Sequence, residues 1–244
     1  MDTPPVTEQE FLDFKCPYCG RTISFPTTDI GEIRECPTCT EALIVPEPGA
    51  AFAAKIPIPI STPRLLLRKP DSEDAPALLE LLTDGTALHE LGWEPWDIEQ
   101  VEQFILREKV VRFPQNDTKM YLSIDLVEKS TVIGLAYLSL SEDRKLADLA
   151  IVLRSSFRRQ GFGTEGIRGL LELSFQGLRV HRVSVDCDIN NQPARATLAK
   201  AGLRFEGESL KNRFVQGAWR SSAYYAMLEE EFGAKPPQKT GQKS

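Results

Sequence analysis

Apolar residues along this chain follow two spacings, and each predicts a different element. A short apolar run such as Leu149–Leu153 predicts a buried strand, whereas apolar residues three and four apart, such as Ile167, Leu170 and Leu171, predict a helix with one buried face. The predicted strands are 64–68, 121–127, 132–140, 147–153, 182–188, 203–210 and 222–228. The predicted helices are 71–82, 97–112, 164–178 and 192–201. This order predicts an α/β (α+β) domain with a mixed central sheet of about seven strands and about four helices.

The remaining segments are polar or rich in proline, and they suggest a division of the chain. Residues 1–10 and the tail 232–244 carry no apolar periodicity, so we expect them to be disordered and mobile. Prolines gather between residues 46 and 63 and favour an extended linker. We therefore predict a small module at 11–46, a Pro-rich linker at 47–61 and the main domain at 62–231.

Four cysteines in the small module have the spacing of a metal site. Cys16 and Cys19 form one CxxC pair, Cys36 and Cys39 form another, and 16 residues separate the pairs. Two such pairs complete a tetrahedral shell of four thiolates, which leaves no open position for catalysis. The pattern predicts a zinc ribbon with a structural Zn2+, with a redox pair or a disulfide set as the alternative. Gly20 suits the turn of the first pair, whereas Thr40 suits the second less well.

Composition and charge narrow the function classes. The chain has 244 residues, 41% of them hydrophobic and 26% charged, as in ordinary globular proteins. Its formal net charge of −6 argues against a nucleic-acid regulator, which is usually basic. We find no secretory signal and no run of about 18 apolar residues, so we expect a cytoplasmic protein without membrane contact. The oligomeric state cannot be read from the sequence.

A basic, glycine-containing loop follows the strand 147–153 and precedes the helix from Thr164. The first N–H groups of a helix have no partner within it, and glycine lets an anion approach them closely. Arg158 and Arg159 add positive charge beside Gly161 and Gly163. The loop is therefore predicted to cradle a pyrophosphate. The alternative is a solvated turn that uses glycine for its geometry. The loop is neither a P-loop nor a three-glycine dinucleotide loop.

Three patterns together resemble the GNAT N-acetyltransferases. Residues 158–163 (Arg-x-x-Gly-x-Gly) resemble the family's acetyl-CoA pyrophosphate loop. Asn191 followed by residues 200–203 (Lys-x-Gly-Leu) resembles its Asn-x-x-Ser…Lys-x-Gly-Phe helix. Residues 62–68 resemble the opening strand of the RimJ/RimL branch, which acetylates protein N-termini. The resemblance covers 62–231 and implies a GNAT fold, whose sheet is splayed around an acetyl-CoA cleft.

The resemblance also assigns cofactor contacts. It implies that a strand backbone pairs with the pantetheine arm, that the glycine loop surrounds the pyrophosphate, and that an asparagine lies near the thioester, where a helix cap is the alternative role. The residues at these positions are Ile151, Val152, Leu153, Arg158, Arg159, Gln160, Gly161, Phe162, Gly163, Thr164 and Asn191.

Two acids are the candidate catalytic residues. The implied reaction is direct attack of a neutral amine on the acetyl thioester, and a carboxylate helps to remove the amine's proton. Asp148 stands where the branch commonly has Glu and is the first candidate, with an exposed strand-end acid as the alternative. Glu90, in the loop that flanks the acceptor in relatives, is the second, with Glu94 as a rival. Leu198 departs from the family, because many relatives have a tyrosine acid there.

The acceptor and the ribbon's partner stay open at this point. The branch suggests a protein N-terminal amine, perhaps ribosomal, and a polyamine or an aminoglycoside is the small-molecule alternative. A rival from another class is a non-catalytic acyl-CoA-binding module whose ribbon binds a protein or a nucleic acid. Cys187, the fifth cysteine, lies in an apolar strand pattern and is expected in the core.

Overall fold

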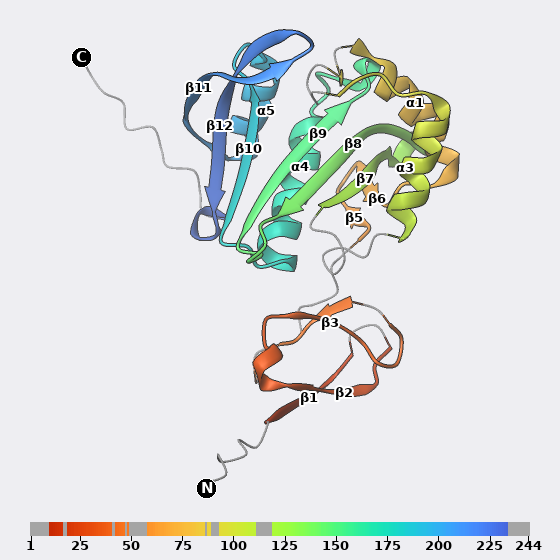
Figure 1. Ribbon diagram of the computed structural model, residues 1–244, viewed down its shortest axis with the longest axis vertical. Coiled ribbons are helices and arrows are strands. Elements are labelled where there is room, and N and C mark those ends of the chain that lie inside the picture. Colours follow the sequence, from red (N-terminus) through yellow and green to blue (C-terminus); the bar gives the residue numbers. More distant parts are fainter. Residues whose placement is uncertain are drawn as a thin grey trace, which may run out of the picture.

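An eight-stranded mixed sheet carries the larger part of the chain (Figure 1). The computed structural model describes residues 10–16, 19–40, 42–46, 48, 58–85, 87–88, 93–110 and 119–233. The strands lie in the order β11-β12-β10-β9-β8-β7-β6-β5. Their bounds are β5 Ile60–Ser61, β6 Leu65–Arg68, β7 Lys119–Leu126, β8 Thr131–Leu140, β9 Leu146–Leu153, β10 Arg182–Asp188, β11 Arg204–Val215 and β12 Ala218–Leu228. The strands of the sheet pair antiparallel, except that β9 and β10 run parallel.

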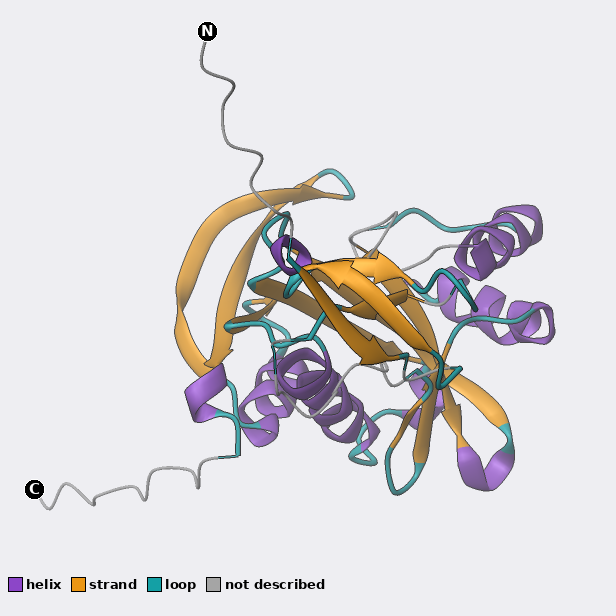
Figure 2. Ribbon diagram, turned by 90° about the horizontal axis from the view of Figure 1, so that it is seen from below, coloured by secondary structure: helices purple, strands orange, loops and turns teal. Residues whose placement is uncertain are grey.

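Helices cover both faces of the sheet, as Figure 2 shows from below. Helices α1 (Ala75–Thr83) and α3 (Ile98–Val110) pack together on one face, against side chains such as Leu135 and Val152. Helices α4 (Phe162–Glu172) and α5 (Gln192–Ala201) cover the other face, where the largest apolar cluster lies. In the described part of the chain, the expected mixed sheet with four helices is thereby confirmed, with eight strands where about seven were predicted.

Three details differ from the predicted elements. The two-residue strand β5 lies in the stretch expected to be linker. Helix α4 ends at Glu172 and continues as a π-helical turn, Leu173–Gly177, where we predicted one helix to 178. Strands β11 and β12 are longer than predicted and form one hairpin, because a turn at Gln216 and Gly217, both with positive φ, joins them directly.

The N-terminal module is built from two small antiparallel ladders. Strand β1 (Phe11–Lys15) pairs with β2 (Thr22–Pro26), and β3 (Ile33–Glu35) pairs with β4 (Ala42–Ile44). An exposed ion pair of 3.8 Å, between Arg144 and Glu32, links this module to the sheet domain. No helix in the described part of the chain has both the length and the apolar character needed to cross a membrane.

Candidate functional site

The sheet opens between its two parallel strands. Strands β9 and β10 pair only at Arg182–Ser184 with Leu146–Asp148. Beyond Asp148 the two strands separate, and among the described residues no strand pairs with that edge of β9. The other edge of β9 stays paired with β8 as far as Leu153. One edge of β9 is therefore available to an extended ligand, which could hydrogen-bond to it as a neighbouring strand would.

The glycine loop ends at the N-terminus of α4. Arg159 and Gly161 both have positive φ, 60° and 85°, and Gly161 is the N-cap residue of the helix. In the described part of the chain, the backbone N–H groups from Arg159 to Thr164 donate no hydrogen bond to another residue. Donors of this kind at a helix N-terminus attract anions, because the helix dipole places partial positive charge there. The loop geometry therefore fits a phosphate group.

Arg64, just before β6, holds this loop in place. Its side chain donates to the Glu165 carboxylate at 2.6 Å and to the Gln160 carbonyl oxygen at 3.1 Å, and it lies over the Phe162 ring. Partial burial raises the pKa of Glu165, but hydrogen bonds from Thr62 and Arg64 outweigh it and hold the pKa below its ordinary value. We predicted no role for Arg64 from the sequence, because its partners lie about a hundred residues further along the chain.

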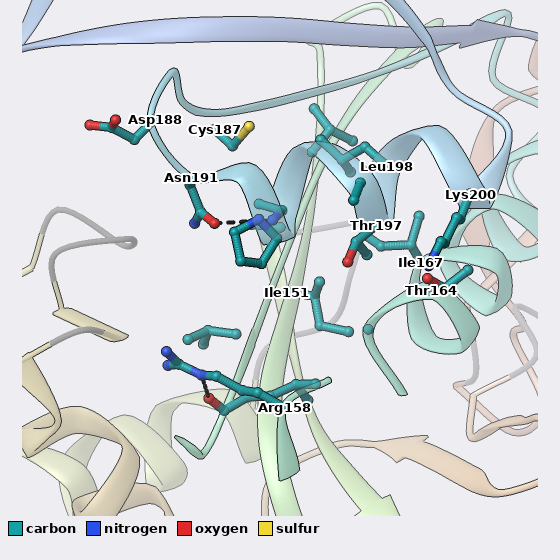
Figure 3. A pocket seen from close by; sticks show the side chains of 18 of the residues that line it. Ile151, Arg158, Thr164, Ile167, Cys187, Asp188, Asn191, Thr197, Leu198 and Lys200 are labelled. Carbon is teal, nitrogen blue, oxygen red and sulfur yellow. Dashed lines mark hydrogen bonds between the residues drawn. The ribbon is translucent and has the colours of Figure 1, made fainter. Parts of the chain in front are cut away.

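A cleft of approximately 770 Å3 joins the open edge of β9 to this loop. Its walls come from β9, the glycine loop, the first turns of α4, the end of β10 and the face of α5 (Figure 3). In this view Arg158 lies across the cleft from Asn191 and Leu198, with Ile151 between them, and Thr164 lies beside Lys200. The volume lies within the range of small-molecule sites, about 300–1,000 Å3.

Nine of the eleven residues proposed for the cofactor line this cleft. They are Ile151, Val152, Leu153, Arg158, Arg159, Gly161, Gly163, Thr164 and Asn191. The other two do not line it. Gln160 is exposed and donates its side-chain amide to the Ser156 carbonyl oxygen, and Phe162 is buried beneath Arg64. Their backbone N–H groups still belong to the loop described above.

Two of the lining side chains also have structural partners. Arg158 donates from Nε to the Leu153 carbonyl oxygen at 2.8 Å, which fixes the end of β9. Asn191 caps α5, because its side-chain oxygen accepts a hydrogen bond from the Ala194 N–H at 3.0 Å. The structure thus shows the helix cap that we named as the alternative role of Asn191, at a position that also faces the cleft.

Asp148 lies where β9 and β10 begin to separate. It is exposed, it accepts a hydrogen bond from the Ser184 hydroxyl at 2.6 Å, and it is not among the cleft-lining residues. Alternation along β9 puts it on the same face as Val152, which is the face of α1 and α3. Burial and the nearby charge of Asp148 raise the pKa of the Tyr137 hydroxyl. Asp148 and Tyr137 therefore lie close together on this face.

Aromatic rings extend from Tyr137 toward the segment between α1 and α3. Trp93 and Trp96 stack with centroids 5.1 Å apart, Trp93 lies 6.0 Å from Tyr121, and Tyr121 lies 5.7 Å from Tyr137. The rival acid Glu94 is exposed in the same segment. The other candidate acid, Glu90, lies outside the described residues.

Sequence reasoning missed several cleft residues. Four further side chains line the cleft but lie outside the glycine loop, which is why the loop pattern did not predict them: Asp186, Thr197, Lys200 and Arg220. Cys187 was expected in the core but is half-buried and lines the cleft. It is accessible there because β10 is no longer paired with β9 at that position. Burial raises the pKa of its thiol to about 11. Its position just before the Asn191 motif was the only available signal. Leu198 is buried in the cleft wall, and none of the described lining residues is a tyrosine.

The four paired cysteines converge in the N-terminal module. Their Sγ atoms all lie within 4.8 Å of one another, with Cys16–Cys39 at 3.7 Å and Cys19–Cys36 at 3.9 Å. Tetrahedral zinc with Zn–S bonds of about 2.3 Å requires S–S separations of about 3.8 Å. All four cysteines are free thiols rather than disulfides. This set of donors fits a structural Zn2+.

The two CxxC turns share one backbone design. Gly20 donates its N–H to the Cys16 carbonyl oxygen, and Thr40 donates its N–H to the Cys36 carbonyl oxygen. Both donors have positive φ, 71° for Gly20 and 58° for Thr40. Burial raises the pKa of the Cys36 thiol, but hydrogen bonds from the N–H groups of Cys39 and Thr38 and from neighbouring thiols outweigh it and lower the pKa to about 6. Such stabilisation of a thiolate suits a metal ligand.

Comparison with known proteins gives one family. Residues 64–204, more than half of the chain, match a family model described as an acetyltransferase (GNAT) domain. The uncharacterized N-acetyltransferase YnaD of Bacillus subtilis is 24% identical over 173 residues, which cover 71% of this chain and 98% of YnaD.

Two solved structures illustrate the range of acceptors among similar folds. One is a spermidine N-acetyltransferase from Vibrio cholerae in complex with CoA and spermine, with a TM-score of 0.61, 17% identity, and coverage of 70% of this chain and 99% of that one. The other is RimL, a ribosomal L7/L12 alpha-N-protein acetyltransferase in complex with coenzyme A, with a TM-score of 0.60, 21% identity, and coverage of 70% and 97%. The N-terminal module precedes the residues that the family model matches.

Proposed function

The chain belongs to the GNAT acetyltransferase family, and from that premise we propose that it acetylates the α-amine of a protein N-terminus. Acetyl-CoA is the acetyl donor of this family, and its acceptor is an amine. The observation that carries the proposal is the continuous cleft from the glycine loop to the open edge of β9. The RimL likeness favours a protein N-terminus, and the spermidine enzyme marks a polyamine as the competing acceptor.

The chain's own residues suit the cosubstrate at both ends of the cleft. The N–H groups from Arg159 to Thr164 would bind the pyrophosphate, and the Arg158 and Arg159 side chains would add charge. The open edge of β9 at Ile151–Leu153 would hydrogen-bond the pantetheine arm. A strand N–H near Val152 would then lie close to the thioester carbonyl, where negative charge develops as the amine attacks.

Asp148 is the proposed base on the acceptor face. Most aliphatic amines are protonated at neutral pH, and only the neutral amine attacks a thioester. Asp148 would accept the amine's proton, directly or through one water. The nitrogen then bonds to the acetyl carbon as the carbon–sulfur bond breaks. Because Leu198 offers no hydroxyl, we assign protonation of the departing CoA thiolate to solvent.

The N-terminal module is proposed to be a zinc ribbon with a structural role. Cys16, Cys19, Cys36 and Cys39 would hold Zn2+, which would supply folding free energy rather than chemistry. The S–S separations and the low pKa of Cys36 support this assignment. The ribbon is a second surface of the molecule, for which a protein or a nucleic acid is the candidate partner.

The test measures CoA release with a library of peptides and small amines. We expect peptides with a free α-amine to accelerate CoA release and their N-formylated counterparts to have no effect. Acceleration by spermidine but by no peptide would overturn the proposed acceptor. Acetyl-CoA binding without release by any amine would overturn acetyl transfer itself.

Asp148→Asn tests the proposed base. We expect kcat to fall by roughly 100-fold or more, as for other general bases, with the loss relieved as pH rises and free neutral amine accumulates. Ser184→Ala is the matched control, because it removes the hydrogen-bond donor to Asp148 but keeps the carboxylate. An unchanged kcat in Asp148→Asn would leave the base to another residue.

A further inference from the structure

Two arginines face each other across the β11–β12 hairpin. Arg213 on β11 is the direct cross-strand neighbour of Arg220 on β12. Like charges placed directly opposite each other destabilise a strand pair, so the arrangement needs a compensating anion. Both arginines have a buried Nε that makes no hydrogen bond.

Only one of the two has an acidic partner. Arg213 lies 3.6 Å from the carboxylate of Asp186. The side chain of Arg220 makes no hydrogen bond or ion pair with any residue in the described part of the chain, although it is half-buried and lines the cleft. An unpaired guanidinium in a cleft is a strong site for an anion, because its planar fork can bind a carboxylate or phosphate through two parallel hydrogen bonds.

The arginine pair, Arg213 and Arg220, lies on the acceptor face of the sheet. Asp148 and Ser184 are cross-strand neighbours joined by a hydrogen bond, and Asp186 follows Ser184 by two residues, so the three share that face. Arg213 reaches Asp186 on the same face. The glycine loop instead belongs to α4, which covers the opposite face. The pair is therefore placed beside the attacking amine rather than beside the pyrophosphate.

We propose that Arg213 and Arg220 bind a carboxylate of the acceptor, so that the acceptor is an amine bearing a nearby acidic group. This inference rests on the proposed acetyl transfer. An acidic side chain next to a peptide N-terminus, or the α-carboxylate of a free amino acid, has this chemistry. A polyamine does not, because its second cation would meet an unpaired arginine. Asp186 would keep Arg213 oriented while Arg220 makes the primary contact.

The test compares pairs of acceptors in which one member carries a carboxylate and the other carries the uncharged amide in its place. One pair of peptides carries Asp or Asn at the second position, the other pair is a free amino acid and its amide, and spermidine is the fifth acceptor. We expect kcat/KM to favour the carboxylate of a pair by about tenfold to a hundredfold, the range for one charge-assisted hydrogen bond. Whichever pair shows the preference identifies the source of the carboxylate.

Variants connect the preference to the arginines. Arg220→Gln should abolish the preference, Arg220→Lys should retain part of it, and acetyl-CoA affinity measured by calorimetry should not change. Lys211→Asn is the matched control, because it removes one positive charge from an exposed position of the same hairpin whose positive φ asparagine tolerates. Loss of acetyl-CoA affinity in Arg220→Gln with an unchanged acceptor preference would overturn the proposal.

A binding measurement separates this inference from the proposed reaction. If no amine is acetylated, the same peptide pairs are titrated into the CoA-bound protein. A carboxylate preference that Arg220→Gln removes would uphold the arginine site while acetyl transfer fails. Equal affinity within each pair would refute the arginine site whether or not turnover occurs.

Discussion

The two parts of this molecule are stabilised in different ways. The sheet domain has a cluster of thirty buried apolar side chains between its strands and helices α4 and α5. Among the module's residues whose burial is described, the buried cluster has five members, and two of them are the ligand candidates Cys16 and Cys36. A module that spans only residues 11–46 is below the roughly 40 residues at which a hydrophobic core alone usually offsets the loss of chain entropy on folding. Burial therefore suffices for the domain, whereas the module would depend on the proposed Zn2+ for its stability.

The largest predicted effect is the unfolding of the N-terminal module alone when its metal is removed. A strong chelator should unfold residues 11–46, because bound Zn2+ supplies roughly 10–16 kcal/mol to such modules. The domain should keep its melting temperature, since an exposed ion pair such as Arg144–Glu32 contributes about 1 kcal/mol or less. All three tryptophans lie at or beyond residue 93, so their fluorescence reports on the domain alone, and hydrogen exchange reports on the module.

Matched cysteine variants sharpen this prediction. Cys36→Ser should lose the bound metal and reproduce the effect of the chelator, whereas Cys187→Ser should bind metal at the wild-type stoichiometry. A drop in the tryptophan-detected melting temperature after metal removal would mean that the two parts fold as one unit.

The second predicted effect is a loss of acetyl-CoA affinity in a variant of the sheet domain that keeps its fold. Gly163→Asp should weaken acetyl-CoA binding by about a hundredfold or more, because a carboxylate would occupy the phosphate position. The helix itself should be preserved, since an acid in the first turn suits the helix dipole. A Cβ here would make only ordinary contacts, with Thr197 Cγ2 at 3.4 Å and with Leu153 Cδ1 and Thr197 Oγ1 at 3.9 Å. Gly163→Asn separates charge from bulk and should cost much less affinity. Calorimetry would measure the acetyl-CoA affinity of both variants. Equal affinities in Gly163→Asp and Gly163→Asn would contradict the predicted effect of charge.

The smallest effect compares the two CxxC turns with each other. Thr40 adopts a φ of 58°, which a β-branched residue tolerates poorly, whereas Gly20 adopts 71° at no steric cost. Thr40→Gly should therefore stabilise the metal-bound module by about 1 kcal/mol, and Gly20→Thr should destabilise it by a similar amount. Denaturant unfolding followed by hydrogen exchange at residues 11–46 would measure both. Destabilisation by Thr40→Gly would show that the threonine has a favourable role that outweighs its strain.

Local patterns in the sequence predicted most of the elements. The bounds of β10 and α5 were predicted without error, because alternation and the Asn191 and Gly202 caps are local signals. The β11–β12 hairpin was predicted too short, although the Gln216-Gly217 turn between Phe214 and Trp219 was visible in the sequence. The strand β5 was missed because two residues carry no periodicity.

The candidate site was less predictable than the fold. The glycine loop was visible because its donors are consecutive in the chain. Arg64 and the Arg213–Arg220 pair were not, because their roles depend on partners brought together by the sheet. Asp148 was named from a motif, and its geometry beside Ser184 and Tyr137 became visible only with the strand register.

The gap between β9 and β10 has a mechanical consequence. Within the sheet, three residue pairs hold the five strands β5–β9 to the three strands β10–β12. An acetyl-CoA arm lying along β9 would act as an additional strand, present only when the cosubstrate is bound, and would connect these two parts of the sheet. Binding of the cosubstrate should then restrict the relative motion of the two parts of the sheet, one of which carries Asp148 and the other Arg220. This favours an ordered mechanism in which acetyl-CoA binds before the amine.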